Sequence, residues 1–184
     1  MNNNALTHPV VADDIIQRAK DITLLVLDVD GVLSDGRLFF SNSGEEIKAF
    51  HSLDGHGIKM LQRSGVDVAI ITGRTSHIVE RRAHSLGIKY LLQGREDKLN
   101  ALTELLEQRP TEYSNIAHMG DDYPDLALIR RVGLGLTTAN AHYAVQHYSH
   151  WQSQFNGGEG AVREACDLIM RAQGTFDDAL ANYL

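Results

Sequence analysis

The chain has 184 residues, of which 43% are apolar, and this is enough to bury one core of ordinary size. Its 24 acidic residues outnumber its 17 basic ones, which gives a formal net charge of -7. A nucleic acid or an anionic membrane surface would require a basic face, so we expect neither as a partner. No linker rich in proline, glycine or serine interrupts the pattern, and we expect residues 1–184 to form a single domain.

The cysteine content and the first residues indicate where the protein works. Cys166 is the single cysteine, so no internal disulfide can form. Residues 1–10 include three asparagines and lack the apolar stretch of a signal peptide, and no run reaches transmembrane length. We therefore expect a cytoplasmic protein.

Apolar runs alternate with amphipathic segments along the chain, which is typical of βαβ units and a parallel sheet. The first predicted strand does not alternate between apolar and polar residues, so we expect it to be buried on both faces. The predicted strands cover 23–27, 66–71, 88–92, 115–119 and 133–136. The predicted helices cover 10–20, 54–64, 76–86, 96–108, 124–131 and 159–171, and a C-terminal tail follows over 175–184. The sequence predicts an α/β fold with a doubly wound, Rossmann-like parallel sheet.

One segment after the first strand breaks this alternation. Residues 37–41 and 46–50 flank 42–45, a loop of turn-forming residues, and this pattern predicts a β-hairpin inserted over about 37–51. A lone hairpin is marginally stable in water, and this one carries three phenylalanines. We expect it to pack against its own domain or against another subunit.

Polar side chains follow the ends of the predicted strands, where open parallel sheets bind their ligands. Asp28 and Asp30 follow the first strand, Thr72 follows the second, and the helix after the third begins near Lys98. The fourth strand leads into a loop with three acidic residues, Asp121, Asp122 and Asp125. Carboxylates hold hard cations, while a lysine and a hydroxyl bind phosphate oxygens. The set therefore suits Mg²⁺ together with a phosphoryl group.

Four motifs in this order make the chain similar to the haloacid dehalogenase-like phosphatase superfamily: DxD at 28–30, TGR at 72–74, Lys98, and GDDxxD at 120–125. Within that superfamily, the chain resembles the 3-deoxy-D-manno-octulosonate 8-phosphate phosphatases. This closer resemblance rests on residues 28–36 (DVDGVLSDG), 54–59 (DGHGIK), 71–74 (ITGR) and 157–164 (GGEGAVRE). It extends over about residues 20–174.

The resemblance implies a mechanism with a covalent intermediate. Asp28 would attack phosphorus and form an aspartyl-phosphate, while Asp30 would protonate the leaving alcohol and then deprotonate the attacking water. Mg²⁺ would be held by the Asp28 carboxylate, the Asp30 backbone carbonyl and Asp121, with Asp122 or Asp125 supporting these ligands from outside. The implied contacts to the phosphate are Thr72, the backbone of Gly73, and Lys98.

A sugar-acid phosphate carries a carboxylate as well as a phosphate, so its site needs cationic or donor groups besides Lys98. From charge complementarity and the resemblance, we expect substrate contacts from Asp30, His51, Ser52, Leu53, Asp54, Gly55, Lys59, Gly73 and Arg74. The implied function is Mg²⁺-dependent hydrolysis of 3-deoxy-D-manno-octulosonate 8-phosphate to the free sugar acid and phosphate, a step in lipopolysaccharide precursor synthesis.

The spacing of the motifs leaves no room for a cap domain, which superfamily members acting on small metabolites usually carry over the site. Only the hairpin lies after the first strand, and one helix and one strand fill the interval between Thr72 and Asp97. A neighbouring subunit must then shield the site from bulk water. The resemblance implies a homotetramer of this kind, with the hairpins packed together.

Three other functions fit parts of the pattern. The same motifs suit a nonulosonate 9-phosphate phosphatase of sialic-acid-type pathways. A noncatalytic regulatory domain of this fold is the second alternative, and the intact Asp28 and Asp30 count against it. A site without a cap also admits phosphoproteins, which makes a phosphoprotein phosphatase the third. For Asp54 or Asp125 alone, a role as a helix N-cap or turn former is an equal alternative to a functional one.

Overall fold

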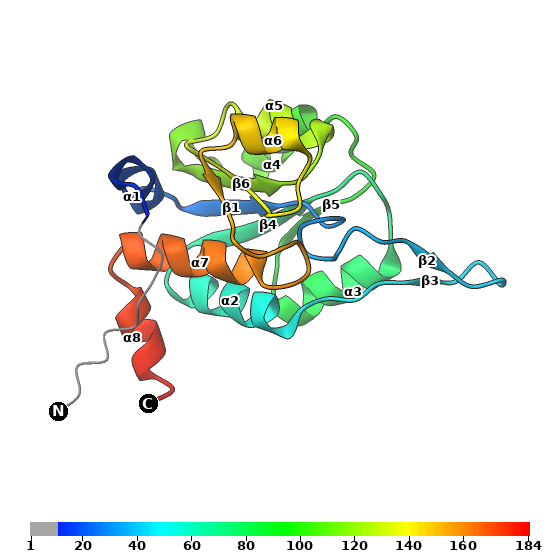
Figure 1. The fold of residues 1–184 in the computed structure, drawn as a ribbon, viewed down its shortest axis with the longest axis horizontal. Helices are drawn as coiled ribbons and strands as arrows, with labels where there is room; N and C mark the ends of the chain where they lie inside the picture. The colour runs from blue at the N-terminus through cyan, green and yellow to red at the C-terminus, as the bar shows by residue number, and fades with distance from the viewer. Residues whose placement is uncertain (1–10) are drawn as a thin grey trace.

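The computed structural model describes residues 11–184, and its centre is one parallel sheet (Figure 1). Within these residues the sheet has six strands in the order β5-β4-β1-β6-β7-β8, and every neighbouring pair is parallel. The strands are β1 (Leu24–Leu27), β4 (Asp67–Ile71), β5 (Tyr90–Leu92), β6 (Ile116–Gly120), β7 (Leu134–Thr137) and β8 (Trp151–Gln152). The chain builds the sheet outward from β1 in one direction and then returns to add β6 on the other side. The predicted α/β fold with a doubly wound, Rossmann-like sheet is confirmed.

Helices cover both faces of the sheet (Figure 1). One layer holds α2 (Ser52–Arg63), α3 (His77–Leu86) and α7 (Ala161–Ala172), and the other holds α4 (Lys98–Gln108), α5 (Leu126–Ile129) and α6 (Tyr143–Tyr148). The helix α1 (Asp13–Lys20) packs against α7. Two short 3₁₀ helices, η1 (Tyr113–Asn115) and η2 (Tyr123–Asp125), flank β6.

The central strand β1 is apolar throughout because each face of the sheet meets a helical layer. Leu25 and Leu27 join the cluster formed with α1, α2 and α7, whereas Leu24 and Val26 join the cluster formed with α4 and α5. All four side chains are fully buried. Adjacent residues of a strand point to opposite faces, so a strand between two helical layers loses the apolar and polar alternation.

The predicted hairpin is present, with shorter strands than the sequence indicates. Its strands β2 (Phe39–Phe40) and β3 (Glu46–Ile47) are antiparallel, and Figure 1 shows them extending away from the rest of the chain. The side chains of Phe39, Phe40 and Ile47 are exposed by 51%, 59% and 62%. In the described chain, β1 and α2 are separated by this hairpin and its flanking loops, while β4 and α4 are separated by α3 and β5. No cap domain lies in either interval.

Four short elements were not predicted from the sequence: η1, α6, β8 and α8 (Phe176–Ala181). The predicted C-terminal tail contains α8, where Phe176 is buried and the Arg171 guanidinium lies 3.5 Å from its ring centroid. The helix α2 begins at Ser52, two residues before its predicted start, because the His51 ring accepts a hydrogen bond from the Leu53 amide. The predicted first helix began at residue 10, and residues 1–10 lie outside the described part of the chain. Over residues 11–184, no helix has the length and apolar character needed to span a membrane.

Candidate active site

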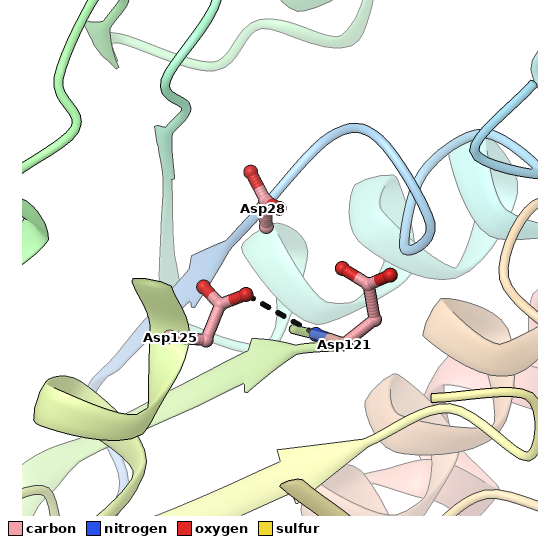
Figure 2. Close-up of side chains that lie close together, drawn as sticks. All are labelled: Asp28, Asp121 and Asp125. Carbon is pink, nitrogen blue, oxygen red and sulfur yellow. Dashed lines mark hydrogen bonds between the residues drawn. The ribbon is translucent and has the colours of Figure 1, made fainter. Parts of the chain in front are cut away.

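The predicted catalytic residues meet at the carboxyl edge of the sheet. Asp28 follows β1, Thr72 follows β4, and Asp121 follows β6, the strand next to β1 on the other side. This is the position where the direction of strand addition reverses, and α/β sheets bind ligands at such positions. Figure 2 shows the side chains of Asp28, Asp121 and Asp125 gathered there, and each offers a carboxylate oxygen within 4.8 Å of the others.

Lys98 connects two of these carboxylates. It is the first residue of α4 and is only 3% exposed. Its Nζ atom lies 3.0 Å from Asp28 Oδ1 and 2.6 Å from Asp125 Oδ1. Burial alone would lower the pKa of Lys98, but the charges of Asp125 and Asp28 outweigh it and raise that pKa above its usual value. The ammonium group is therefore charged and stands beside the predicted nucleophile.

One lysine does not balance the negative charge of the site. Burial, followed by repulsion from Asp125, raises the pKa of Asp28 to about 6 in spite of Lys98. Burial, followed by repulsion from Asp28 and Asp125, raises the pKa of Asp121 to about 7. Two adjacent carboxylates with raised pKa values are a donor set that a hard divalent cation would stabilise. Asp28 and Asp121 therefore fit a magnesium ion.

Two glycines let the acidic side chains approach the backbone closely. Gly31 has a φ of 90°, and a Cβ there would lie 2.0 Å from Asp121 Oδ2. At Gly120 a Cβ would lie 2.2 Å from Asp125 Cγ. A side chain at either position would displace a carboxylate, which explains why glycine stands in both the DxDG and the GDD segments.

Asp125 supports the site through hydrogen bonds. Its Oδ1 atom faces Lys98 Nζ and, at 2.9 Å, His118 Nε2, while its Oδ2 atom accepts from the amides of Asp121 and Asp122. The bond to the Asp121 amide is the dashed line in Figure 2. These donors contact both oxygens of Asp125 and join it to Lys98, to His118 and to the backbone of Asp121 and Asp122. Asp122 is exposed. Its carboxylate accepts a hydrogen bond from the Tyr123 amide and caps η2, so its side chain has a local capping role.

Asp30 is held by cations from two other segments. The Nζ atom of Lys48, on the hairpin, contacts Asp30 Oδ1, and Arg74 Nε lies 3.8 Å from Asp30 Oδ2. Glu46 joins both cations, with its carboxylate 3.3 Å from Lys48 Nζ and 3.2 Å from Arg74 Nη2. Ser76 also donates to Glu46 at 2.7 Å, and this bond contributes most to lowering the pKa of that carboxyl. The hairpin therefore contributes polar groups to the site of its own chain.

The segment after β4 is also placed as predicted. Thr72 is buried, and its backbone is fixed by bonds to Leu92 and Arg95. Gly73 has open space where a Cβ would stand. The Arg74 side chain is partly exposed and lies over the Phe40 ring of the hairpin at 5.9 Å from its centroid. Thr72 and Gly73 can thus present donors to an incoming phosphate.

The predicted substrate contacts at the start of α2 contact α3 and α7 in their own chain. Asp54 Oδ1 accepts from the Arg163 amide at 2.8 Å, and Arg82 Nη2 donates to the His51 carbonyl at 3.2 Å, so both residues join helices together. Gly55 lies against the Arg82 side chain. Ser52 is exposed, and Leu53 lines a cavity of about 670 Å³ beside α7. Their role in substrate binding stays a prediction.

Lys59 likewise lies away from the other predicted residues. It is exposed and lines a hollow with Gly87, Lys89 and Asp67, which is the first residue of β4. Strands of a parallel sheet begin at the edge opposite to the one where they end, so this hollow lies away from the carboxyl edge. The role of Lys59 in substrate binding stays a prediction.

Three residues of the network were not predicted: Lys48, Glu46 and His118. Lys48 and Glu46 belong to the hairpin, and the sequence does not show where a hairpin folds back. His118 carries a signal that sequence reasoning could have used, because it is an ionisable residue inside a predicted buried strand. Buried ionisable groups require a partner, so such a residue indicates a polar network.

Comparison with known proteins assigns the family. Residues 91–165 match the haloacid dehalogenase-like hydrolases. The 3-deoxy-D-manno-octulosonate 8-phosphate phosphatase of Yersinia pestis is 48% identical over 169 residues, which cover 92% of this chain and 90% of the relative. This chain belongs to the 3-deoxy-D-manno-octulosonate 8-phosphate phosphatase family. The Escherichia coli K12 phosphatase of the same family is 46% identical over the same shares of the two chains.

Solved structures of this phosphatase family have the same fold. A probable YrbI family phosphatase from Pseudomonas syringae is 55% identical and superposes with a TM-score of 0.92 over 94% of this chain and 98% of its own. The family member from Moraxella catarrhalis, solved in complex with a magnesium ion, a phosphate ion and a KDO molecule, is 44% identical with a TM-score of 0.92 over 95% and 100% of the two chains. As a member of this phosphatase family, the chain is a phosphoric monoester hydrolase.

Proposed function

We propose that the chain hydrolyses 3-deoxy-D-manno-octulosonate 8-phosphate to the free sugar acid and inorganic phosphate, as a cytoplasmic step of lipopolysaccharide precursor synthesis. The observation that carries this proposal is the convergence of Asp28, Asp30, Lys98 and Asp121 at the carboxyl edge of one sheet, in a family named for that reaction. The catalytic unit is a single domain, with the hairpin as its insertion.

The chemistry follows from the positions of two aspartates. An Asp28 carboxylate oxygen attacks phosphorus, and the bond between phosphorus and the sugar oxygen breaks as the aspartyl-phosphate forms. Asp30, two residues further along the same loop, donates its proton to the leaving alkoxide. It then takes a proton from the water that attacks the aspartyl-phosphate, which releases phosphate and restores both carboxyls.

Lys98, the Thr72 hydroxyl and the Gly73 amide stabilise the anionic groups in these steps. Lys98 Nζ already lies 3.0 Å from Asp28, so it can offset charge on the nucleophile and on the phosphoryl group. The Thr72 hydroxyl and the Gly73 amide are the proposed donors to the phosphoryl oxygens. The Asp28 and Asp121 carboxylates and the Asp30 backbone carbonyl would hold Mg²⁺. That ion supplies a positive charge that reduces the repulsion between the anionic nucleophile and the anionic phosphate.

We assign recognition of the substrate carboxylate to Arg74. Its partly exposed guanidinium stands beside Asp30 and is paired with only one oxygen of Glu46. An R74A variant should therefore raise KM much more for the sugar-acid phosphate than for a neutral aryl phosphate. An equal increase for the two substrates would contradict this assignment.

We further propose a homotetramer in which the exposed apolar side chains of the hairpin pack together. Leu38, Phe39, Phe40 and Ile47 are all exposed in the single chain, which is costly unless a partner covers them. In such an assembly, residues 51–55 and Lys59 would serve the substrate of a neighbouring subunit. A monomer in light scattering that kept full turnover would contradict this assembly.

A panel of substrates tests the proposed function. The assay measures kcat/KM with Mg²⁺ for octulosonate 8-phosphate, nonulosonate 9-phosphate, a phosphopeptide and an aryl phosphate. D28N is the blank because it removes the nucleophile, and E107Q is the matched control because Glu107 is exposed near the end of α4 farthest from Lys98. We expect the highest kcat/KM for octulosonate 8-phosphate. A higher value for the nonulosonate or the phosphopeptide would replace the proposal with that alternative.

A further inference from the structure

His118 is a fully buried ionisable residue in the middle of β6, and the mechanism above assigns it no role. It pairs with Val26 of β1 across the sheet, one strand position before the loops that carry the active site. Its Nδ1 atom lies 3.2 Å from the Val26 carbonyl oxygen, and its Nε2 atom lies 2.9 Å from Asp125 Oδ1. Both ring nitrogens therefore face oxygen atoms of other groups.

These two contacts fix the orientation of the His118 ring between β1 and Asp125. An ionised carboxylate only accepts hydrogen bonds, so the Nε2–H group of His118 donates to Asp125 Oδ1. Burial raises the pKa of Asp125, but the hydrogen bond from His118 and the charge of Lys98 outweigh it and lower the value to about 2, which keeps Asp125 ionised.

The contacts of Asp125 connect His118 to the reacting groups. Asp125 Oδ1 is shared between His118 and Lys98, and Lys98 in turn reaches Asp28 at 3.0 Å. Its Oδ2 atom holds the amide of Asp121 at 3.2 Å. Rotation of the Asp125 carboxylate would therefore move both the ammonium group beside Asp28 and the backbone of a proposed metal ligand.

We propose that His118 is a positioning residue, which acts through Asp125 to hold Lys98 against Asp28 and to fix the backbone of Asp121. This role rests on the proposed phosphatase mechanism but not on the identity of the sugar. An aryl phosphate can therefore serve as the test substrate.

Two substitutions separate positioning from simple packing. H118Q keeps an amide donor that can reach Asp125, whereas H118F fills the space without a donor. Loss of an outer hydrogen-bond partner of a catalytic group typically lowers metal affinity or activity by about 10- to 100-fold. We expect H118F to lose turnover of the aryl phosphate and Mg²⁺ affinity, measured by calorimetry, within this range. H118Q should retain most of both.

M119L is the matched control, because Met119 is the next residue of β6, is fully buried and is apolar. It should keep turnover and Mg²⁺ affinity near those of the native protein. Native values in H118F, or equal losses in H118F, H118Q and M119L, would overturn the positioning role. If H118F does not fold, H118N decides, because its shorter amide faces Val26 and not Asp125, and native turnover and Mg²⁺ affinity in H118N would overturn the role. Loss of octulosonate activity alone, with aryl phosphate turnover intact, would count against the proposed substrate and not against His118.

Discussion

Replacing Asp121 with asparagine should stabilise the metal-free protein, even though it removes a proposed metal ligand. Burial and the neighbouring carboxylates raise the pKa of Asp121 from its usual 3.8 to about 7. At about 1.4 kcal/mol per pH unit, this rise corresponds to about 4 kcal/mol of destabilisation above pH 7. Asp121 is partly exposed, and solvent screening reduces the effect, so we expect D121N to gain about 2 kcal/mol.

The sign of the pH dependence follows from the direction of the pKa change. The folded protein holds the Asp121 proton more tightly than the unfolded chain does, so this group costs stability as the pH rises. The cost begins near pH 4, where the unfolded carboxyl ionises, and is complete above about pH 7. D121N does not titrate, so its advantage over the native protein should be absent near pH 3 and largest at pH 8.

Thermal unfolding with a chelator present measures this difference. For a chain of this length, 2 kcal/mol corresponds to a rise in Tm of about 4–8 °C. E107Q is the control because Glu107 is exposed near the end of α4 farthest from Lys98, and its Tm should remain near the native value. Added Mg²⁺ should raise the Tm of the native protein more than that of D121N. A D121N variant with unchanged Tm at pH 8, or with the same gain at pH 3 and pH 8, would refute the electrostatic reasoning.

Three further substitutions test single contacts of the structure. G31A should weaken Mg²⁺ affinity in calorimetry by about 10- to 100-fold, because its Cβ would displace the Asp121 carboxylate. D54A should lower the free energy of unfolding in urea by about 1–2 kcal/mol, since the Arg163 amide at the start of α7 loses its acceptor. K98M should lower kcat by about 10²- to 10³-fold while the protein remains folded, because a charge-stabilising donor is lost.

The fold could be predicted where burial alone determines an element. The segments 23–27 and 115–119 are mostly apolar because both faces of those strands are covered, and they appear as β1 and β6. The short elements α6, β8 and α8 could not be predicted in this way. The two residues of β8 form a strand because β7 provides its hydrogen-bonding partner, and α8 depends on the burial of Phe176. Such elements are stabilised by tertiary contacts, which leave no periodic pattern in the sequence.

The site could be predicted where residues follow strand ends. Asp28, Thr72 and Asp121 meet because parallel strands end at one edge, and because β4 and β6 are the two neighbours of β1 in the sheet. The surroundings of the residues on α2 could not be predicted in this way. A helix presents residues in several directions, and Asp54 faces the start of α7 while Lys59 faces β4.

The hairpin is the insertion between β1 and α2, where no cap domain lies, and it also contacts the proposed acid and base, Asp30. Opposed residues of an antiparallel pair share a face, so Phe39 and Ile47 lie on one face, and Phe40 and Glu46 lie on the other. The second face carries the ion pairs to Arg74 and, through Lys48, to Asp30, and the Lys48 side chain is only 1% exposed. Any partner that covers the exposed face would remove water from these ion pairs and strengthen them. The element proposed to drive assembly is therefore the same element that holds the proposed acid and base, which gives a site without a cap a way to gain shielding and order in one step.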